Sequence, residues 1–338
     1  MDIDNGKVEG RGIPSWLVPV FGYAVSIACL VWVYQGTNWK AQWALIRGTE
    51  WYWVLAAVVC DIAVYVVQGW RWNLLLSPVG AIPIVKSVQA IYIGLFANEI
   101  LPFKPGEVIR CFLQSRWSGV DFPVVLSSVV IERLIDGIWL ILGFVVVATT
   151  VHVPRIFLMG GLLLATLLVM IAVLMFVAMA RKHHQKSGPQ STVQRWLNHL
   201  SDGLEAMGDS PSFFYSAALS LVYLLLQIGP IYFLMCGYFD KYNMVGVAAV
   251  VLVLLRLGTI APQAPSNVGS FQALVIVGLR IMGVERQQAA GFATLLFVVI
   301  TLPLWVAGFF ALMATRMRLD DIRRNARELH QPNPRIIS

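Results

Sequence analysis

Long apolar runs alternate with short polar segments along the chain. A helix of about 20 residues rises about 30 Å, which is enough to cross the hydrocarbon layer of a bilayer. The pattern predicts long helices over residues 16–34, 51–72, 82–101, 121–151, 155–180, 213–238, 243–260 and 286–315, and two shorter helices ending near residues 118 and 282. Tryptophan pairs flank the second run, as at a membrane interface. Trp39 and Trp43 are assigned to a polar loop.

The composition excludes a soluble globular protein. Hydrophobic residues make up 58% of the 338 residues and charged residues only 13%, whereas about a quarter of a soluble domain is charged. We therefore predict an all-α, polytopic integral membrane protein. It would form a single transmembrane domain over residues 1–338, with about six spanning helices and two re-entrant broken helical hairpins.

The net charge of +7 comes from basic residues that flank the apolar runs. This distribution orients helices in a membrane, so we predict no nucleic-acid partner. The loop over residues 181–211 and the tail over residues 316–338, which holds six arginines and no lysine, are both predicted to be cytoplasmic. If residues 82–118 form a hairpin that enters and leaves by one face, the same rule places Arg71, Lys86, Arg110 and Arg116 on the cytoplasmic side. The first run of this segment is also long enough to span the membrane, and the sequence leaves this choice open. The four cysteines and five histidines show no metal-ligand spacing, so we predict no metal or cofactor.

Two polar breaks interrupt the apolar pattern. Both contain a P-x-x-P sequence and a nearby glycine: Pro102, Pro105 and Gly106 in the first, and Pro262, Pro265 and Gly269 in the second. Each break follows an apolar run and precedes a short helix that ends in Gly-Val-acid, at residues 119–121 and 283–285. In a bilayer, backbone that leaves the helical conformation must be buried in protein or line a wet cavity. The breaks therefore mark a candidate functional site.

The matching contexts of the breaks predict an internal repeat. Each unit would consist of a helix, a broken hairpin and a second helix, over residues 51–151 and 213–315. If the first hairpin enters from the cytoplasm and the second from outside, the units have inverted topology. Transporters built this way bind substrate near the midplane, between their broken helices.

The first break has the chemistry of an anion site. A helix starting near Pro105 would direct free N–H groups and its positive dipole end at a phosphate, and Lys104 and Arg110 would add charge. Glu107 opposes this interpretation, because its carboxylate could cap the same N–H groups. The alternative is a capped, self-neutralised turn.

A second candidate set lies near the middle of the 121–151 helix, where Glu132, Arg133 and Asp136 are expensive to bury. Arg133 could pair with Glu107 or Glu99 of the hairpin. A net acidic cluster could bind a cationic headgroup or carry a proton. The alternative, compatible with it, is a buried ion-pair network that locks the hairpin to the helix.

Fewer polar residues stand out in the second unit. Arg256 lies shortly before the second break, and Gln272 lies on the short helix after it. Asp61 is a lone acid midway along the 51–72 helix. The sequence leaves open whether Asp61 pairs with Arg71 or with Arg256.

The motifs NEILPFKPGEVIR, at residues 98–110, and SSVVIERLIDG, at residues 127–137, resemble the transmembrane, flippase-like domain of lysylphosphatidylglycerol synthases and its stand-alone relatives. The shared motif includes Asn98, Pro102, Gly106, Glu107, Arg110, Glu132, Arg133 and Asp136. Lys104 stands where arginine is usual, and Gln272 stands where the family often has glutamate. The resemblance implies movement of lipids across the bacterial cytoplasmic membrane. The soluble aminoacyl-transferase domain is absent from this sequence, so lipid synthesis of that type is not expected.

We therefore expect a lipid transporter that is not an enzyme. Its ligand would be a membrane lipid, with a phosphate-bearing headgroup held between the two breaks. The candidate binding residues are Asn98, Glu99, Lys104, Glu107, Arg110, Glu132, Arg133, Asp136, Arg256 and Gln272. The alternative is a lipid-binding or scaffold protein that recruits a lipid-modifying enzyme through its loop and tail. A homo-oligomer is compatible with either. An intramembrane transferase is disfavoured, because no nucleophile or metal set accompanies the acids.

Overall fold

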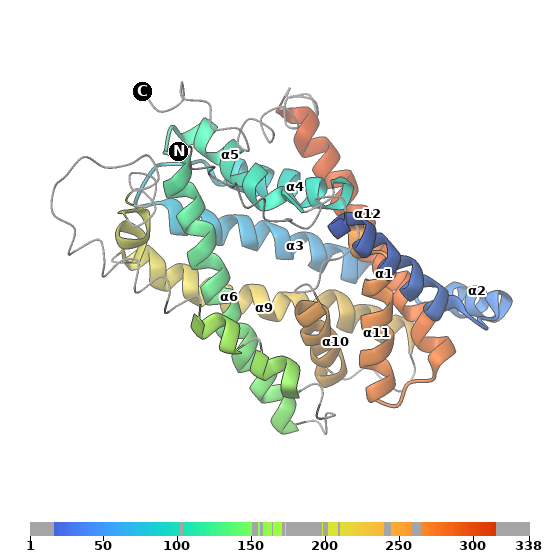
Figure 1. The fold of residues 1–338 in the computed structure, drawn as a ribbon. Coiled ribbons are helices and arrows are strands. Elements are labelled where there is room, and N and C mark those ends of the chain that lie inside the picture. The colour runs from blue at the N-terminus through green and yellow to red at the C-terminus, as the bar shows by residue number, and fades with distance from the viewer. Residues whose placement is uncertain are drawn as a thin grey trace, which may run out of the picture.

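The computed structural model describes residues 17–101, 104–150, 155, 158–163, 165–170, 173, 198, 202–208, 210–239, 245–258 and 265–315. Within these ranges all regular structure is helical. The range predicted as the first unit contains α3 (Trp51–Leu76), α4 (Ile84–Ile100), α5 (Gly106–Ser118) and α6 (Phe122–Thr150). The range predicted as the second unit contains α9 (Pro211–Tyr238), α10 (Val245–Gly258), η1 (Pro265–Asn267), α11 (Ser270–Ile281) and α12 (Arg286–Ala314). Two helices, α1 (Leu17–Tyr34) and α2 (Trp39–Arg47), precede them (Figure 1).

The helix bounds follow the apolar pattern closely, with one correction. The segment assigned to a polar loop is the helix α2. Its N-terminus is capped by Asn38, whose side chain accepts a hydrogen bond from the Ala41 N–H at 3.3 Å. Asparagine is a favoured N-cap because it satisfies one of the N–H groups that a helix start leaves unpaired. Asn38 was therefore the local signal for this helix.

Three helices in the described part of the chain, α3, α9 and α12, are long and apolar enough to cross a membrane. Helix α6 has 29 residues but carries the three charged residues Glu132, Arg133 and Asp136. The count of about six spans and the re-entrant geometry of the hairpins stay predictions. Pro102, Pro262 and the tail over residues 316–338 lie outside the described residues, as does most of the 181–211 loop.

Helices α3 and α9 pack along each other in opposite directions. At one end, the Glu50 N–H donates to the Gly237 carbonyl at 3.2 Å. At the other end, Ser77 and Ser212 share a hydrogen bond of 2.9 Å between their hydroxyls. The first helices of the two units are thus antiparallel and form the centre of the bundle (Figure 1).

The remaining helices make matching contacts around this pair. In each unit the two helices of the hairpin pack together, α4 on α5 and α10 on α11. The last helix of each unit contacts the other unit: α12 packs on α3 and α4, and α6 packs on α9 and α10. Both short helices also end alike, since Gly119 and Gly283 adopt left-handed φ angles of 70° and 84°. Glycine is favoured at such a helix end because it carries no Cβ.

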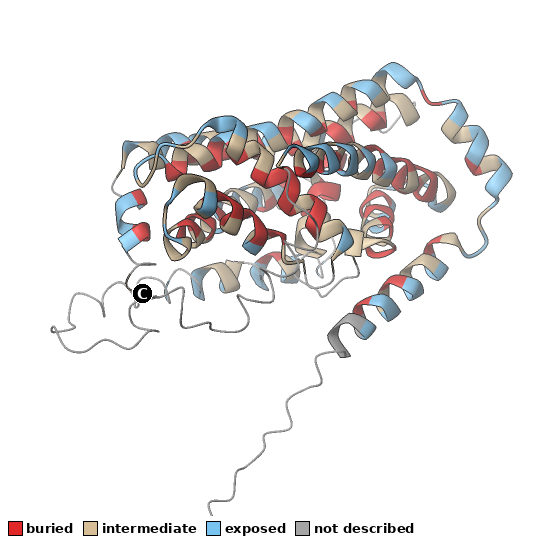
Figure 2. Ribbon diagram, turned by 90° about the horizontal axis from the view of Figure 1, so that it is seen from above, coloured by how far each residue is buried: buried red, intermediate tan, exposed pale blue. Residues whose placement is uncertain are grey.

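Buried residues face the interior of the bundle, and exposed residues lie on its outer surfaces (Figure 2). Many of the exposed residues are large and apolar. The outward face of α12 is an example: its exposed large side chains are Val298, Leu302, Trp305, Val306, Phe309, Phe310 and Met313. A water-soluble protein rarely exposes such a continuous apolar stripe. This surface is compatible with lipid, in agreement with a multi-pass membrane protein.

Two glycines set the approach of α4 to α5. A Cβ built on Gly106 would lie 2.0 Å from the Gly94 carbonyl oxygen, and one built on Gly94 would lie 2.7 Å from the Gly106 oxygen. Both distances are too short for a side-chain carbon, so the hairpin closes only because glycine occupies both positions. This close approach fixes where the first break meets α4.

Candidate functional site

The two breaks contact each other directly. Lys104 of the first break donates a hydrogen bond from Nζ to Oδ1 of Asn267 in the second. The Ser266 hydroxyl donates to the Glu99 carbonyl oxygen at 3.0 Å. Lys104, Ser266 and Asn267 all have left-handed φ angles, of 49°, 58° and 53°, which are uncommon for residues other than glycine. Strained backbone of this kind often marks functional sites.

A cavity of about 420 Å³ lies between the breaks and is lined by both units. The first unit contributes Asp61 and Gln68 of α3, Asn98 and Glu99 of α4, and Lys104. The second contributes Tyr223 and Gln227 of α9, Arg256 of α10, and the break residues Ser266 and Asn267. Its volume suits a lipid headgroup or another small polar ligand.

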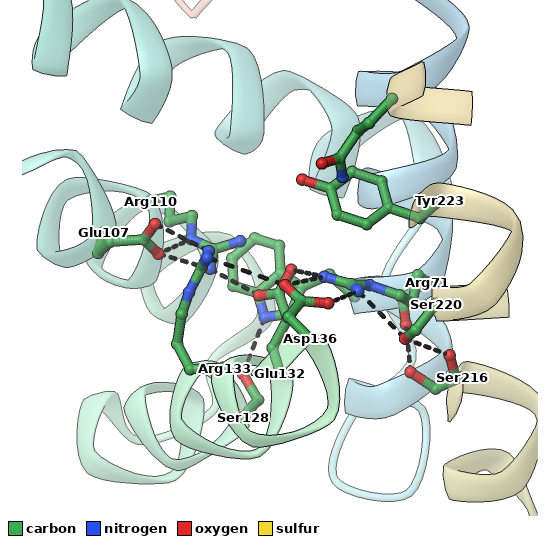
Figure 3. A network of polar contacts seen from close by, with 12 residues as sticks. Arg71, Glu107, Arg110, Ser128, Glu132, Arg133, Asp136, Ser216, Ser220 and Tyr223 are labelled. Atoms are coloured by element: carbon green, nitrogen blue, oxygen red, sulfur yellow. Dashed lines mark hydrogen bonds and ion pairs between the residues drawn. The ribbon is translucent and has the colours of Figure 1, made fainter. Parts of the chain in front are cut away.

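Beside this cavity, three arginines and three carboxylates form a closed ring with alternating charges (Figure 3). In order around the ring, its members are Arg71, Glu132, Arg110, Glu107, Arg133 and Asp136. They come from α3, α5 and α6. The ring therefore ties the first helix of the unit to its hairpin and to its last helix, with no net charge.

Glu132 is the most enclosed acid of the ring. It is 2% exposed, and its carboxylate accepts hydrogen bonds from Arg71 and, at 2.6 Å, from Arg110. Arg110 also donates from Nε to Glu107 at 2.7 Å. Buried charges are tolerated when paired and hydrogen-bonded in this way. Glu132 thus acts as the bridge between α3 and α5.

The opposite edge of the ring opens toward the cavity. Glu107 and Arg133 both line the cavity, and they are joined by a hydrogen bond of 3.0 Å. The Arg133 Nη1 atom also lies 3.8 Å from Asp136 Oδ2, and the Asp136 carboxylate accepts a hydrogen bond from Arg71. Of the six ring residues, Glu107 and Arg133 line the cavity, and the other four do not.

Aromatic and hydroxyl side chains hold the two buried arginines. The Arg71 guanidinium lies over the Tyr223 ring at 4.5 Å and donates to the Ser220 hydroxyl at 3.1 Å. The Arg110 guanidinium lies over the Trp72 ring at 4.7 Å. Cation–π contacts are strong when the cation is desolvated. Through these contacts with Tyr223 and Ser220, the charge ring of the first unit also contacts α9 of the second unit.

The family of the lysylphosphatidylglycerol synthase TM region matches residues 20–308 of the chain. This range covers the first unit, the second unit as far as residue 308, both breaks and the whole charge ring. The chain belongs to this family. No curated protein matches it. Membership indicates a multi-pass membrane protein with a function related to membrane lipids.

Within this lysylphosphatidylglycerol synthase TM region, the predicted anion site is already partly occupied by protein groups. Asn98 accepts a hydrogen bond from the Gly106 N–H at 2.6 Å and so caps α5. The Glu107 carboxylate binds Arg110 and Arg133 instead of acting as that cap. Arg110 is 3% exposed and belongs to the ring. Of the two basic residues predicted to meet a phosphate, only Lys104 lines the cavity.

In the second unit of the region, Arg256 lines the cavity and donates from Nε to Gln227 Oε1 at 3.0 Å. Gln272 does not line the cavity and has a structural role instead. It is 3% exposed, and its Oε1 accepts from the Gly269 N–H at 2.7 Å, so it caps α11. Gly269 has a φ of 85°, and a Cβ there would lie 2.3 Å from the Ser26 carbonyl oxygen. The second break is therefore shaped by its packing against α1.

The sequence did not assign Arg71 to the site, although it is central to the ring. Its position near the end of an apolar helix suggested only an interfacial charge. Arg71 pairs with Glu132 and Asp136, so the idea that it pairs with Asp61 is wrong. Its role could not be read from spacing, because its partners are more than 60 residues away in sequence.

Proposed function

We propose that this protein is a lipid transporter of the bacterial cytoplasmic membrane, with its C-terminus in the cytoplasm. It would move a phospholipid, or a polyprenyl or hopanoid-type lipid, from one leaflet to the other. The headgroup would bind in the cavity between the two breaks, and the hydrocarbon chains would remain in the bilayer. The proposal requires no chemical step and no cofactor.

The observation that carries the proposal is the cavity itself. Both breaks line it, and each unit contributes a basic side chain, Lys104 from the first and Arg256 from the second. Polar groups are costly inside a membrane protein and usually mark a substrate path. A phosphate placed between these two side chains would be held by both units at once, as a transporter that moves one unit against the other requires.

The arrangement of the helices supports inverted topology for the two units. Antiparallel packing of α3 on α9 is what a two-fold axis in the membrane plane would produce, and so are the matched contacts of α12 with α4 and of α6 with α10. The charge ring belongs to the first unit only. We infer that the ring keeps the first hairpin rigid, so that the second break is the more movable wall of the cavity.

The test is lipid translocation in proteoliposomes. Wild-type protein should move headgroup-labelled phosphatidylglycerol between leaflets faster than protein-free liposomes do. Lys104→Gln and Arg256→Gln should each lower the rate about tenfold or more, because a hydrogen bond to a charged group contributes about 1.5–3 kcal/mol.

Lys86→Gln is the matched control. Lys86 lies over the Trp117 ring at 4.8 Å and does not line the cavity, so its variant should transport at the wild-type rate. If wild-type protein bound the lipid without moving it, the scaffold alternative would replace the transport proposal. Unchanged rates in both cavity variants would show that the headgroup binds elsewhere.

A further inference from the structure

Asp61 is a buried acid that the charge ring does not use. It lies in the middle of α3, is 4% exposed and lines the cavity between the breaks. Its Oδ2 atom is buried and has no hydrogen-bond partner among the described residues. The other buried acid of the first unit, Glu132, has both oxygens bound by arginines. Glu132 is therefore a buried acid that is paired with cations, whereas Asp61 is a buried acid with an oxygen that accepts no hydrogen bond from the described residues.

Burying the ionised form of Asp61 costs more free energy than burying its protonated form. A carboxylate buried without donors is unfavourable, because it loses its hydration and gains no hydrogen bonds in return. The protonated acid is neutral and costs less to bury. A carboxyl group in this position can exchange a proton when the polarity of the cavity changes, for example when a charged ligand enters.

The cavity that Asp61 lines contains charged groups of both signs and phenols. Tyr65 of α3 lines the same cavity, and its ring packs against that of Tyr92 of α4 with 5.7 Å between the ring centroids. The Tyr92 hydroxyl donates to the Ile62 carbonyl oxygen at 3.4 Å. The remaining ionisable groups that share the cavity are Glu99, Lys104, Glu107, Arg133, Tyr223 and Arg256. An anion bound in this cavity would therefore add negative charge to the space that Asp61 lines.

We propose that Asp61 is a proton-binding site linked to the anionic headgroup: the lipid binds when Asp61 is protonated, and the proton is released when the lipid leaves. This inference rests on the proposed function, because it assumes that the cavity takes a lipid headgroup. A phosphate bound in the cavity adds a negative charge to the space that Asp61 lines. This charge favours the protonated acid, and by linkage a protonated Asp61 favours the phosphate equally.

The ring acids are poorer candidates for this role. Glu132 and Asp136 each accept hydrogen bonds from Arg71, and Glu107 accepts from Arg110 and Arg133. Protonating any of them would leave a buried or half-buried arginine with a missing partner, which is costly. The suggestion that these acids carry a proton is therefore replaced by one that uses Asp61.

The first measurement concerns Asp61 alone. Infrared spectra of the purified protein in nanodiscs would be recorded between about pH 6 and about pH 10, a range in which ordinary carboxyl groups are already ionised. Wild-type protein should show a protonated-carboxyl band that disappears as the pH rises. The band should be absent from Asp61→Asn, which resembles the protonated acid in shape, and present in Glu285→Gln, a control at the exposed start of α12. A band that persists in Asp61→Asn would overturn the proposal.

The second measurement tests the link to the headgroup. Binding of short-chain phosphatidylglycerol to wild-type protein should weaken about tenfold per pH unit above the midpoint found by infrared, as expected for one linked proton. Asp61→Asn should bind with an affinity that does not change over this range, and short-chain phosphatidylcholine should show a smaller pH dependence in wild type. Equal pH dependence in the two proteins would overturn the link. If wild-type protein bound no phospholipid at any pH while the infrared band remained, the lipid function would fail and the proton site would stand.

Discussion

Lys104 Nζ is hydrogen-bonded to Asn267 Oδ1, and this bond joins the two breaks, which are 163 positions apart in sequence. Both residues have left-handed φ angles, 49° and 53°, and both line the cavity. The contact closes one wall of the cavity with side chains from the two units. Movement of the units relative to each other would break it, so it is a natural place to test whether transport needs such movement.

Locking this contact should stop transport. Replacing both residues by cysteine, in a background without the four native cysteines, lowers transport through the loss of Lys104 but allows a short, reducible thiol-specific cross-linker to join the breaks. A linker is needed because the hydrogen bond joins the ends of the side chains, and a direct disulfide requires Cα atoms within about 7 Å. We expect the remaining headgroup translocation to fall to the protein-free rate on cross-linking and to return to the rate of the untreated double variant on reduction. The single-cysteine variants, treated identically, are the controls, and a rate that cross-linking leaves unchanged would rule out opening at this contact.

Removing Arg71 from the charge ring should destabilise the protein. Arg71→Met leaves the buried carboxylate of Glu132 and that of Asp136 without their shared partner. Breaking a buried ion pair in this way costs about 3–5 kcal/mol. The measurement is thermal unfolding in detergent, followed by intrinsic fluorescence.

The double variant Arg71→Met, Glu132→Gln tests how much of the lost stability comes from the unpaired charge of Glu132 and how much from lost packing of Arg71. It restores the neutrality of the ring, so it should unfold at a higher temperature than Arg71→Met alone, and the two effects should not add. Additive losses of stability would mean that Arg71 and Glu132 act independently, contrary to the geometry of the ring.

Gly106→Ala should open or unfold the first hairpin. The new Cβ would lie 2.0 Å from the Gly94 carbonyl oxygen, and backbone cannot yield as a flexible side chain can. Overpacking typically costs about 1–3 kcal/mol, and more when nothing can shift. Gly143→Ala on α6 is the control, because its Cβ would meet only Leu224 at 3.8 Å. Its unfolding temperature should equal or slightly exceed that of wild type, and similar losses in both variants would contradict the close approach.

The antiparallel packing of α3 and α9 predicts a specific cross-link. Ser77 and Ser212 have hydroxyls 2.9 Å apart, so cysteines at these two positions should form a disulfide in membranes. Cysteines at Ser77 and Ser220 should not, because Ser220 bonds Arg71, more than one turn away along α3. Cross-linking of the second pair in place of the first would mean that the helices run in a different register.

The sequence determined the helices and the position of the polar breaks, because both depend on local properties. An apolar run long enough to span a bilayer predicts a helix wherever it stands, and the bounds of α3, α5, α9 and α12 follow from such runs and from the Pro and Gly residues between them. The Gly-Val-acid sequences marked the ends of both short helices for the same reason, and the inverted repeat that they suggest stays a prediction. The capping role of Asn98 was not apparent, although it lies in the motif, because the N–H that it binds belongs to the next helix.

Only the tertiary structure decided which polar residues work together. The acids and arginines near the first break could have formed an anion site, a net acidic cluster or an ion-pair network, and their spacing suited each of these. Packing of α3 and α5 against α6 brings Arg71 to Glu132 and Asp136 and closes the neutral ring. It leaves Lys104, Arg256 and Asp61 at the cavity. Ion pairing depends on distances between helices that are far apart in sequence, and no local pattern encodes those distances.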